Sequence, residues 1–447
     1  MRSPNAAAWL WLLRKEWREL LVSRSGWMLL VLMGPLTGAS FIAAMRSYAE
    51  ISGVNGGLAG VGEAMAPLIG VWAPTFSACE LAAVFLLPFV AIRMVGADRQ
   101  SGALKLELQR NISPFARMGA KVAVALAGWL IAMLPPASAL LLWKSYGGTL
   151  YAPELLTLAG GHVLNAALTI ALGAAAAAVT EHPSTAAIAT LGVTVGTWMI
   201  HYFAALQGGL WERAAAFTPA AIIGDFQHGL LRLNAVLVAV LLTLAGLAIA
   251  AIWQRLGVRT WRRGAASLLV TFGAAVAIFG AAQVRPSWDL SESRGNSFPA
   301  ADEQALRGLR EPLKIVAHLA PEDPRRTDLE RSAFGKLRRL MPNLEIEYQS
   351  ATSTGLFEQS NAGYGEIWYL YQGRQQMSRV TTADGVLESI YEIAQVQLPG
   401  DVPETVFRGH PLAVLPAGAS TVFYGLWPGL TLLSGILIRR QLQQSPR

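Results

Sequence analysis

Apolar runs long enough to cross a lipid bilayer occupy most of the chain from residue 27 to residue 283, and one more lies near its end. A membrane-spanning helix needs about 20 residues, because every backbone group must find its hydrogen-bond partner inside the segment. Eight segments meet this length: Trp27–Met45, Phe76–Gly96, Met118–Leu142, Leu155–Val179, Thr185–Phe203, Ala235–Trp253, Ala265–Gln283 and Leu412–Ile438. We therefore expect an α-helical polytopic membrane protein, with a polar region at 284–411 inserted before the last span.

Basic residues in the short connecting segments predict the orientation, since Lys and Arg are retained on the cytoplasmic side. Four basic groups stand before the first span, after the second, after the sixth and at the end of the chain: Arg14, Lys15, Arg18 and Arg24; Lys105, Arg110, Arg117 and Lys121; Arg255, Arg259, Arg262 and Arg263; Arg439, Arg440 and Arg447. A cytoplasmic start puts all four groups inside. The region 284–411 then lies outside.

The net charge of +7 is thus mainly a topology signal. No basic stripe alternates with aromatic residues in a soluble region, so nucleic acid is not an expected partner. Cys79 is the single cysteine. An internal disulfide framework and a cysteine-rich zinc site are therefore both excluded.

Residues 1–26 predict an amphipathic helix in the inner membrane interface. Trp9, Leu10, Leu13, Trp17, Leu20 and Leu21 recur at helical spacing, and the opposite side carries Arg14, Lys15, Arg18 and Glu19. No small-residue cleavage site follows, so this segment is not expected to be a signal peptide. Two interpretations stay open for it: an anchor for the first span, and a docking helix for a partner.

The loop after the second span, Ala97–Lys121, has the most informative local pattern. A charged start leads to a turn at Ser101 and Gly102, then to an amphipathic stretch at 103–109 and a break at Pro114. This loop, with the basic helix before the first span, resembles the type-two ABC transporter permease family. The matching positions are Asp98, Ser101, Gly102, Leu104, Pro114, Gly119 and Lys121. Ala103 replaces the usual Thr, and Lys105 stands where an acidic residue is common.

The resemblance covers about residues 9–253 and implies a six-span permease domain at 27–260. It implies that the loop contacts a separate ATPase subunit, which holds ATP and Mg, and that a second permease copy or a homologue completes the pathway. The expected location is a bacterial cytoplasmic (inner) membrane. A seventh helix would lie at 261–283, and an eighth helix with a short cytoplasmic tail at 412–447.

The region 284–411 resembles the extracytoplasmic auxiliary component of gliding-motility-type ABC transporters. The resemblance rests on the following positions: Asp289, Leu290, Ser291, Leu306, Leu309, Pro312 and Ile315. Fusion of both parts in one chain departs from the usual two-chain arrangement. The resemblance implies a domain that binds substrate or a periplasmic partner.

The residues of this region predict a small α/β domain without help from the resemblance. We expect helices at 301–309, 328–341 and 384–395, the last begun by an aspartate cap, and strands at 313–320, 344–349, 366–372 and 376–381. The last two strands flank Gly373. Neither a nucleophile elbow nor a His-Glu-x-x-His pair occurs in the sequence, so a binding or coupling module is favoured over an enzyme.

The chain also lacks a phosphate-binding Gly-x-x-x-x-Gly-Lys-Ser/Thr loop, so no cofactor is expected on this chain itself. Ionisable residues in apolar segments often face a cavity or a partner, and Glu80 and Arg93 are the main candidates. The leading hypothesis is the membrane subunit of an ATP-driven exporter in contact with membrane lipid. Two alternatives remain: a subunit that transmits force to an envelope assembly without moving a solute, and a membrane-anchored envelope enzyme.

Overall fold

This computed structural model describes residues 4–55, 66–100, 112–207, 210–215, 218–255, 257–320, 323–349, 363–397 and 407–444. Within these residues, eight segments are long and apolar enough to cross a membrane, as expected of a multi-pass membrane protein. They are Arg24–Gly53, Leu68–Gly96, Pro114–Ser145, Ala152–Val179, Pro183–Ile200, Leu233–Trp253, Thr260–Ala282 and Thr421–Leu442. Each overlaps one of the eight predicted segments.

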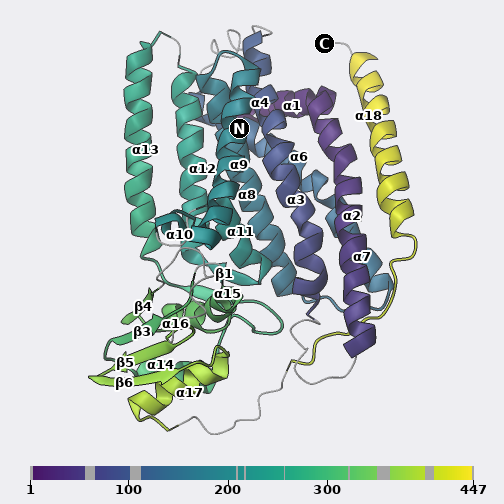
Figure 1. Cartoon of the computed structure of the whole chain (residues 1–447). Coiled ribbons are helices and arrows are strands. Elements are labelled where there is room, and N and C mark those ends of the chain that lie inside the picture. The colour runs from purple at the N-terminus through teal and green to yellow at the C-terminus, as the bar shows by residue number, and fades with distance from the viewer. Residues whose placement is uncertain are drawn as a thin grey trace.

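The helices stand side by side in one bundle (Figure 1). In chain order, they are α2 (Arg24–Asn55), the π-helical turn η1 (Leu68–Trp72), α3 (Ala73–Phe85), α4 (Leu87–Gln100), α6 (Pro114–Ala132), α7 (Leu134–Ser145), α8 (Ala152–Val179), α9 (Pro183–Gln207), α12 (Leu233–Trp253), α13 (Thr260–Ala282), the π-helical turn η4 (Thr421–Leu426) and α18 (Trp427–Gln444). Two short helices, α10 (Leu210–Ala215) and α11 (Pro219–Gln227), lie between α9 and α12.

Helix α8 is the centre of the bundle, because it packs against α3, α4, α6, α9, α11 and α12. Glycines permit these close approaches. A side chain at Gly161 would meet Phe226 of α11, and one at Gly246 of α12 would meet the backbone of Ala171. Close approach at small residues is the usual way in which helices pack in membranes. By contrast, α13 contacts mainly α12 and leaves most of its surface exposed.

The last apolar helix begins later than the sequence predicts. The predicted span starts at Leu412, but the chain stays non-helical through Pro416, and the helix starts only at Ala419. Pro411 and Pro416 explain the difference, since proline removes a backbone donor and disfavours helix in the residue before it. The backbone N–H of Leu412 instead donates to Ser52 Oγ at 3.0 Å.

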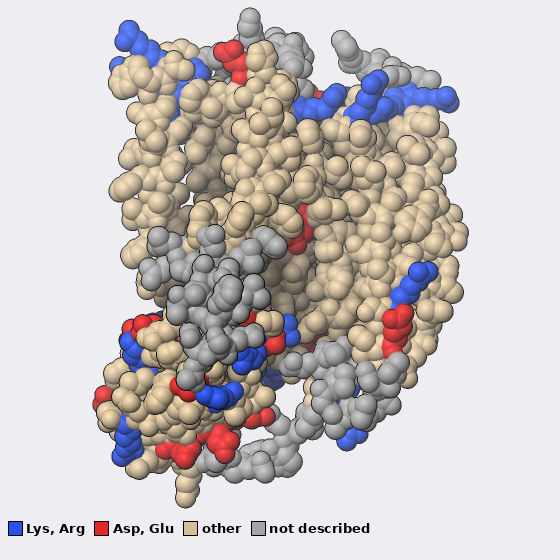
Figure 2. Space-filling model, in the orientation of Figure 1, with Lys and Arg blue, Asp and Glu red and all other residues tan. Residues whose placement is uncertain are grey.

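Helix α1 (Pro4–Val22) runs across one end of the bundle (Figure 1). The start of α13 and the end of α18 lie at the same end, which we call the α1 end. The α/β domain lies at the other end, which we call the domain end. Figure 2 shows Lys, Arg, Asp and Glu gathered mostly at these two ends on the visible face, with an almost uncharged band between them. This is the charge distribution expected of helices that cross a bilayer.

The domain at 287–397 holds the sheet that the sequence predicts. Its strands β3 (Leu313–Ala317), β4 (Leu344–Tyr348), β5 (Ile367–Tyr371) and β6 (Arg374–Ser378) lie in the order β4-β3-β5-β6. β3 and β4 are parallel, and the other pairs are antiparallel. The helices are α14 (Ala300–Gly308), α15 (Pro324–Leu329), the π-helical turn η2 (Glu330–Phe334), α16 (Gly335–Leu340) and α17 (Ala383–Ala394).

Every second side chain of β5 is buried and contributes to the hydrophobic core of this domain. Ile367, Tyr369 and Tyr371 are buried, whereas the residues between them are half-buried. The buried set packs with side chains from the helices, among them Leu337 of α16 and Ile390 of α17. The period of two is the pattern of a strand with one face toward a core.

One cap and several bounds of the predicted domain are wrong: for example, the helix expected from residue 328 begins at Pro324, and the strand expected to reach residue 320 ends at Ala317. Thr382, not Asp384, caps α17: its side chain accepts a hydrogen bond from the backbone N–H of Gly385 at 3.3 Å, and Asp384 lies in the first turn. Strand β6 begins two residues earlier than predicted. A two-residue turn at Gln372 and Gly373, both with positive φ, joins it directly to β5.

Several direct contacts join the domain to the bundle. Strand β1 (Leu230–Arg232), which precedes α12, pairs antiparallel with β2 (Ser287–Asp289) after α13. The backbone N–H of Glu292 donates to Glu154 Oε2 of α8 at 3.1 Å. His410, in the segment that leads to the last helix, has its Nε2 3.0 Å from Glu292 Oε1, and its carbonyl accepts a hydrogen bond from the Tyr48 hydroxyl of α2 at 2.8 Å. The domain is therefore attached to the bundle and is not a separate body on a loose tether.

Candidate functional site

Helix α1 presents a stripe of residues at every fourth position to the bundle. Leu12, Glu16 and Leu20 are buried, and Glu16 is fully buried between the two leucines. Leu20 fits close to α6, because Gly128 has no side chain to occupy that space. At the end of α1, the indole N–H of Trp27 donates to the carbonyl of Leu21 at 2.7 Å. These contacts fix α1 against the end of the bundle.

Glu16 was not among the predicted site residues. The sequence suggested a polar side formed by Arg14, Lys15, Arg18 and Glu19, and of these Arg14 and Arg18 are indeed exposed. One signal could have identified Glu16: it lies one helical turn after Leu12 and one before Leu20, so it is an acidic residue within an apolar stripe.

Two predicted residues of the second loop meet Glu16 at this place. Asp98 lies at the end of α4, and Lys121 lies two turns into α6, whose first turn is capped by the Ser113 hydroxyl and begins with Pro114. Lys121 Nζ donates to Glu16 Oε1 at 2.7 Å and to the carbonyl of Met94 at 3.0 Å, and it also forms an ion pair with Asp98. Glu16, Asp98 and Lys121 are 0 %, 1 % and 2 % exposed, so these three side chains are closed to solvent.

Lys15 completes the network from the other side of α1. Its Nζ lies 2.5 Å from Asp98 Oδ1, 3.1 Å from Glu19 Oε1 and 3.2 Å from Glu16 Oε1. We call Lys15, Glu16, Glu19, Asp98 and Lys121 the charge network. It joins α1 to α4 and α6, which come much later in the sequence.

The three carboxylates of the charge network lie close enough together to suggest a metal site. The two ammonium groups, however, already bind these carboxylates, so each carboxylate has a lysine partner. Burial raises the pKa of the Glu16 carboxyl above its ordinary value, and the nearby Lys121 and Lys15 oppose this effect. The chemistry of the cluster is that of a buried ion-pair network, in which loss of one partner is costly.

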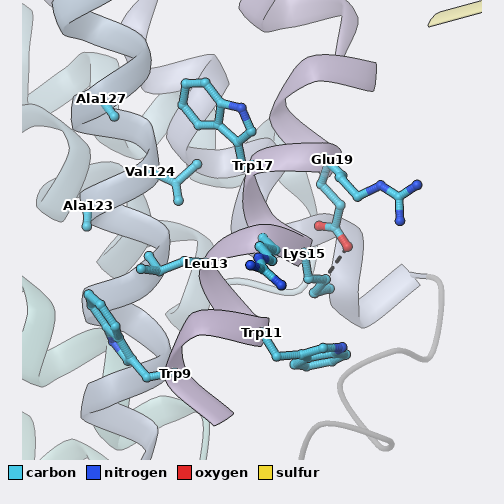
Figure 3. A pocket seen from close by; sticks show the side chains of 11 residues that line it. Trp9, Trp11, Leu13, Lys15, Trp17, Glu19, Ala123, Val124 and Ala127 are labelled. Atoms are coloured by element: carbon cyan, nitrogen blue, oxygen red, sulfur yellow. Dashed lines mark ion pairs between the residues drawn. The ribbon is translucent and has the colours of Figure 1, made fainter. Parts of the chain in front are cut away.

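A groove runs along the outer side of the charge network (Figure 3). Its volume is about 970 Å³, and residues of α1 and α6 line it. Trp9, Leu13 and Trp17 lie along the side nearer the α6 residues, while Trp11, Lys15 and Glu19 lie on the other side (Figure 3). Half-exposed tryptophans with nearby Arg14 and Arg18 are typical of a surface at a membrane interface or against a protein partner.

Of the remaining predicted residues, those that the structure describes, Arg93 and Glu80, do not join this cluster. Ser101, Gly102 and Leu104 fall in 101–111, outside the described residues. Arg93 is exposed on α4. Glu80 of α3 lies elsewhere in the bundle and lines a cavity of about 250 Å³.

The cavity at Glu80 has a partly polar wall. Asn165 and Thr169 of α8 and Thr194 and Thr197 of α9 contribute to it, together with apolar residues such as Trp198. A pocket between helices with a few polar groups is a common place for a ligand. The sequence indicated Glu80 but not the polar residues of α8 and α9 beside it.

Comparisons with protein-family models, with curated proteins and with solved structures each find no match to this chain.

Proposed function

We propose that this chain is the membrane subunit of an ATP-driven transport complex of the type-two ABC permease kind, with ATP and Mg bound by a separate ATPase subunit. The charge network carries this proposal. It ties α1 to α4 and α6, which stand immediately before and after the segment 101–111 that resembles the ATPase-contacting loop.

The network gives this loop a physical route into the bundle. A force on 101–111 acts on the end of α4 and the start of α6, and Asp98 and Lys121 pass it to α1 through ion pairs that solvent does not weaken. Helix α6 packs on α8, the central helix. Movement of the loop would thus reach the middle of the bundle.

In this proposal, the α1 end faces the cytoplasm of a bacterial cell and the α/β domain lies on the extracytoplasmic side of the cytoplasmic membrane. The basic residues at the α1 end support this orientation. The domain would bind substrate or a periplasmic partner, and a second copy or a homologue would complete the pathway. Export is the favoured direction.

Movement of a solute is favoured over force transmission alone, because the cavity at Glu80 offers polar groups inside the bundle. A substitution that fills this cavity tests the choice. Thr197→Trp should make a compound accumulate inside cells while the ATPase stays bound, and Thr271→Trp on exposed α13 serves as the control. Equal metabolite profiles for both variants would favour force transmission.

The experiment that tests the main proposal is purification of the tagged full-length chain from its native host in mild detergent. A Walker-motif ATPase should be identified with it by mass spectrometry, and it should be lost when Gly102 and Leu104 are both replaced by glutamate. Lys144→Met, at an exposed position of α7, should retain it. Repeated purification without an ATPase, under conditions that preserve other ABC complexes, would contradict the proposal.

A further inference from the structure

A second charged region lies at the domain end, where the α/β domain meets the bundle. A pocket of about 750 Å³ opens there between the ends of α11 and α13, strand β1, and the helices α15 to α16 of the domain. Its wall contains five arginines: Arg232, Arg285, Arg331, Arg338 and Arg339. The carboxylates of the wall are Asp225 and Glu330. We call this the arginine pocket.

Both carboxylates already have partners. Asp225 Oδ2 accepts a hydrogen bond from Arg232 Nη1 at 3.0 Å. Glu330 accepts two from Arg338, at 2.7 Å and 2.8 Å, and another from the Tyr348 hydroxyl. Each carboxylate thus already has an arginine partner.

The other arginines retain excess positive charge. Arg285 and Arg331 are exposed and form no ion pair with any described residue. Arg339 donates to the carbonyl of Asn296 at 2.5 Å. Burial and the nearby Arg232 guanidinium lower the pKa of Arg339, and the carboxylates of Asp225, Asp289 and Glu303 oppose this effect.

The surroundings of the pocket indicate the kind of anion. Gln283 and Ala282, at the end of α13, form part of its wall. From there, a stripe of exposed apolar residues runs back along α13: Phe279, Val276, Phe272 and Leu268. An anionic group in the pocket can therefore continue directly into an apolar chain on α13.

We propose that the arginine pocket binds the phosphate headgroup of an anionic phospholipid, with the acyl chains along α13. Guanidinium groups bind phosphate oxygens in a planar, two-pronged geometry, and clusters of basic residues beside membrane helices recognise anionic headgroups. This inference does not depend on the proposed function, because it concerns the chain without an ATPase.

The test is equilibrium binding of radiolabelled dioctanoyl phosphatidylglycerol to the purified full-length chain in a zwitterionic detergent. Binding should be saturable, and dioctanoyl phosphatidylcholine should compete poorly. The double variant Arg285→Gln with Arg331→Gln should weaken binding roughly tenfold or more, because two charge-assisted hydrogen-bonding groups are lost.

The matched control is the double variant Arg310→Gln with Arg408→Gln, which removes the same charge from exposed positions outside the pocket. It should leave binding unchanged. Equal weakening by both double variants would overturn the proposal in favour of diffuse surface attraction. Equal competition by phosphatidylcholine would overturn it too.

Two soluble competitors separate a lipid from a free anion. Glycerophosphoglycerol, the headgroup without acyl chains, and inorganic phosphate should both compete far more weakly than the lipid, since neither contacts α13. If either competes as well as the lipid, the site binds a free phosphate-type anion and the lipid proposal is wrong.

Discussion

The charge network at the α1 end and the arginine pocket at the domain end both gather ionised side chains, but they do so in opposite ways. In the network, two lysines bind three carboxylates and the central groups are closed to water. In the pocket, five arginines face two carboxylates that are already paired, and the wall is open. A cluster with a buried centre, in which each charged group has a partner in the chain, holds elements of the same chain together. An unbalanced, open cluster has charge available for a ligand.

The largest expected effect comes from removing one charge of the network. Lys121→Met leaves Glu16 and Asp98 buried with less positive charge, so we expect the free energy of unfolding to fall by about 3 to 5 kcal/mol. Unfolding by SDS in mixed micelles measures this loss. Lys144→Met, at an exposed site, should change little. A loss of similar size in both variants would contradict the importance of burial.

The next effect comes from separating the helices without changing a charge. Gly128→Val places a side chain against Leu20 of α1. We expect this overpacking to lower the free energy of unfolding by about 1 to 3 kcal/mol and to loosen the charge network. The same unfolding experiment applies. Gly119→Val on the same helix is the control, because nothing described lies near its side-chain position. If Gly119→Val costs as much, the loss reflects helix propensity and not the α1 contact.

Glu16→Gln should change the free energy of unfolding at neutral pH by no more than about 1 kcal/mol. The variant loses an ion pair, but it no longer buries a charged carboxylate. The pH dependence is more informative. Since the pKa of Glu16 is raised in the folded state, the unfolded state loses this proton first as pH rises above 4.5. The wild type should therefore lose stability relative to Glu16→Gln from that pH up to the raised pKa. A constant difference across this range would show that the pKa of Glu16 does not change on folding.

The smallest effect is expected in the arginine pocket. Arg338→Gln breaks the ion pair with Glu330. Because the Arg338 side chain is 43 % exposed, we expect the free energy of unfolding to fall by at most about 1 kcal/mol. Salt should reduce this small contribution further, whereas the effect of Lys121→Met should persist. Unfolding at low and high salt compares the two. A salt-insensitive loss at Arg338 as large as that at Lys121 would remove the distinction between the two regions.

Much of the fold could be predicted because its patterns are local. The apolar runs gave the candidate spans, and the short apolar runs within 313–320 and 366–372 gave two strands of the sheet. The late start of the last helix could also have been predicted locally, because Pro411 and Pro416 both disfavour a helix before Ala419. The N-cap of α17 could not be assigned from the sequence, because Thr382 and Asp384 are both residue types that are favoured at the N-cap position.

The candidate site was only partly predictable, because its contacts are not local. The family resemblance indicated Asp98 and Lys121, and the helical pattern indicated Lys15. That these three residues meet at Glu16 depends on contacts between α1, α4 and α6, which no local pattern records. The arginine pocket was not predicted for the same reason. Its residues come from the bundle and from the domain, and Arg285 and Arg331 have no neighbouring motif that marks them.

The contact between α2 and the helix that follows the α/β domain has a consequence for the order of assembly. Phe423 and Trp427 fill the space beside Gly38 and Gly34, and the indole of Trp427 donates to the carbonyl of Leu30 at 2.7 Å. These partners are 397 residues apart in the chain. During synthesis, the first span must therefore wait beside lipid or other helices, with its glycine surface open, until the ribosome has completed the α/β domain.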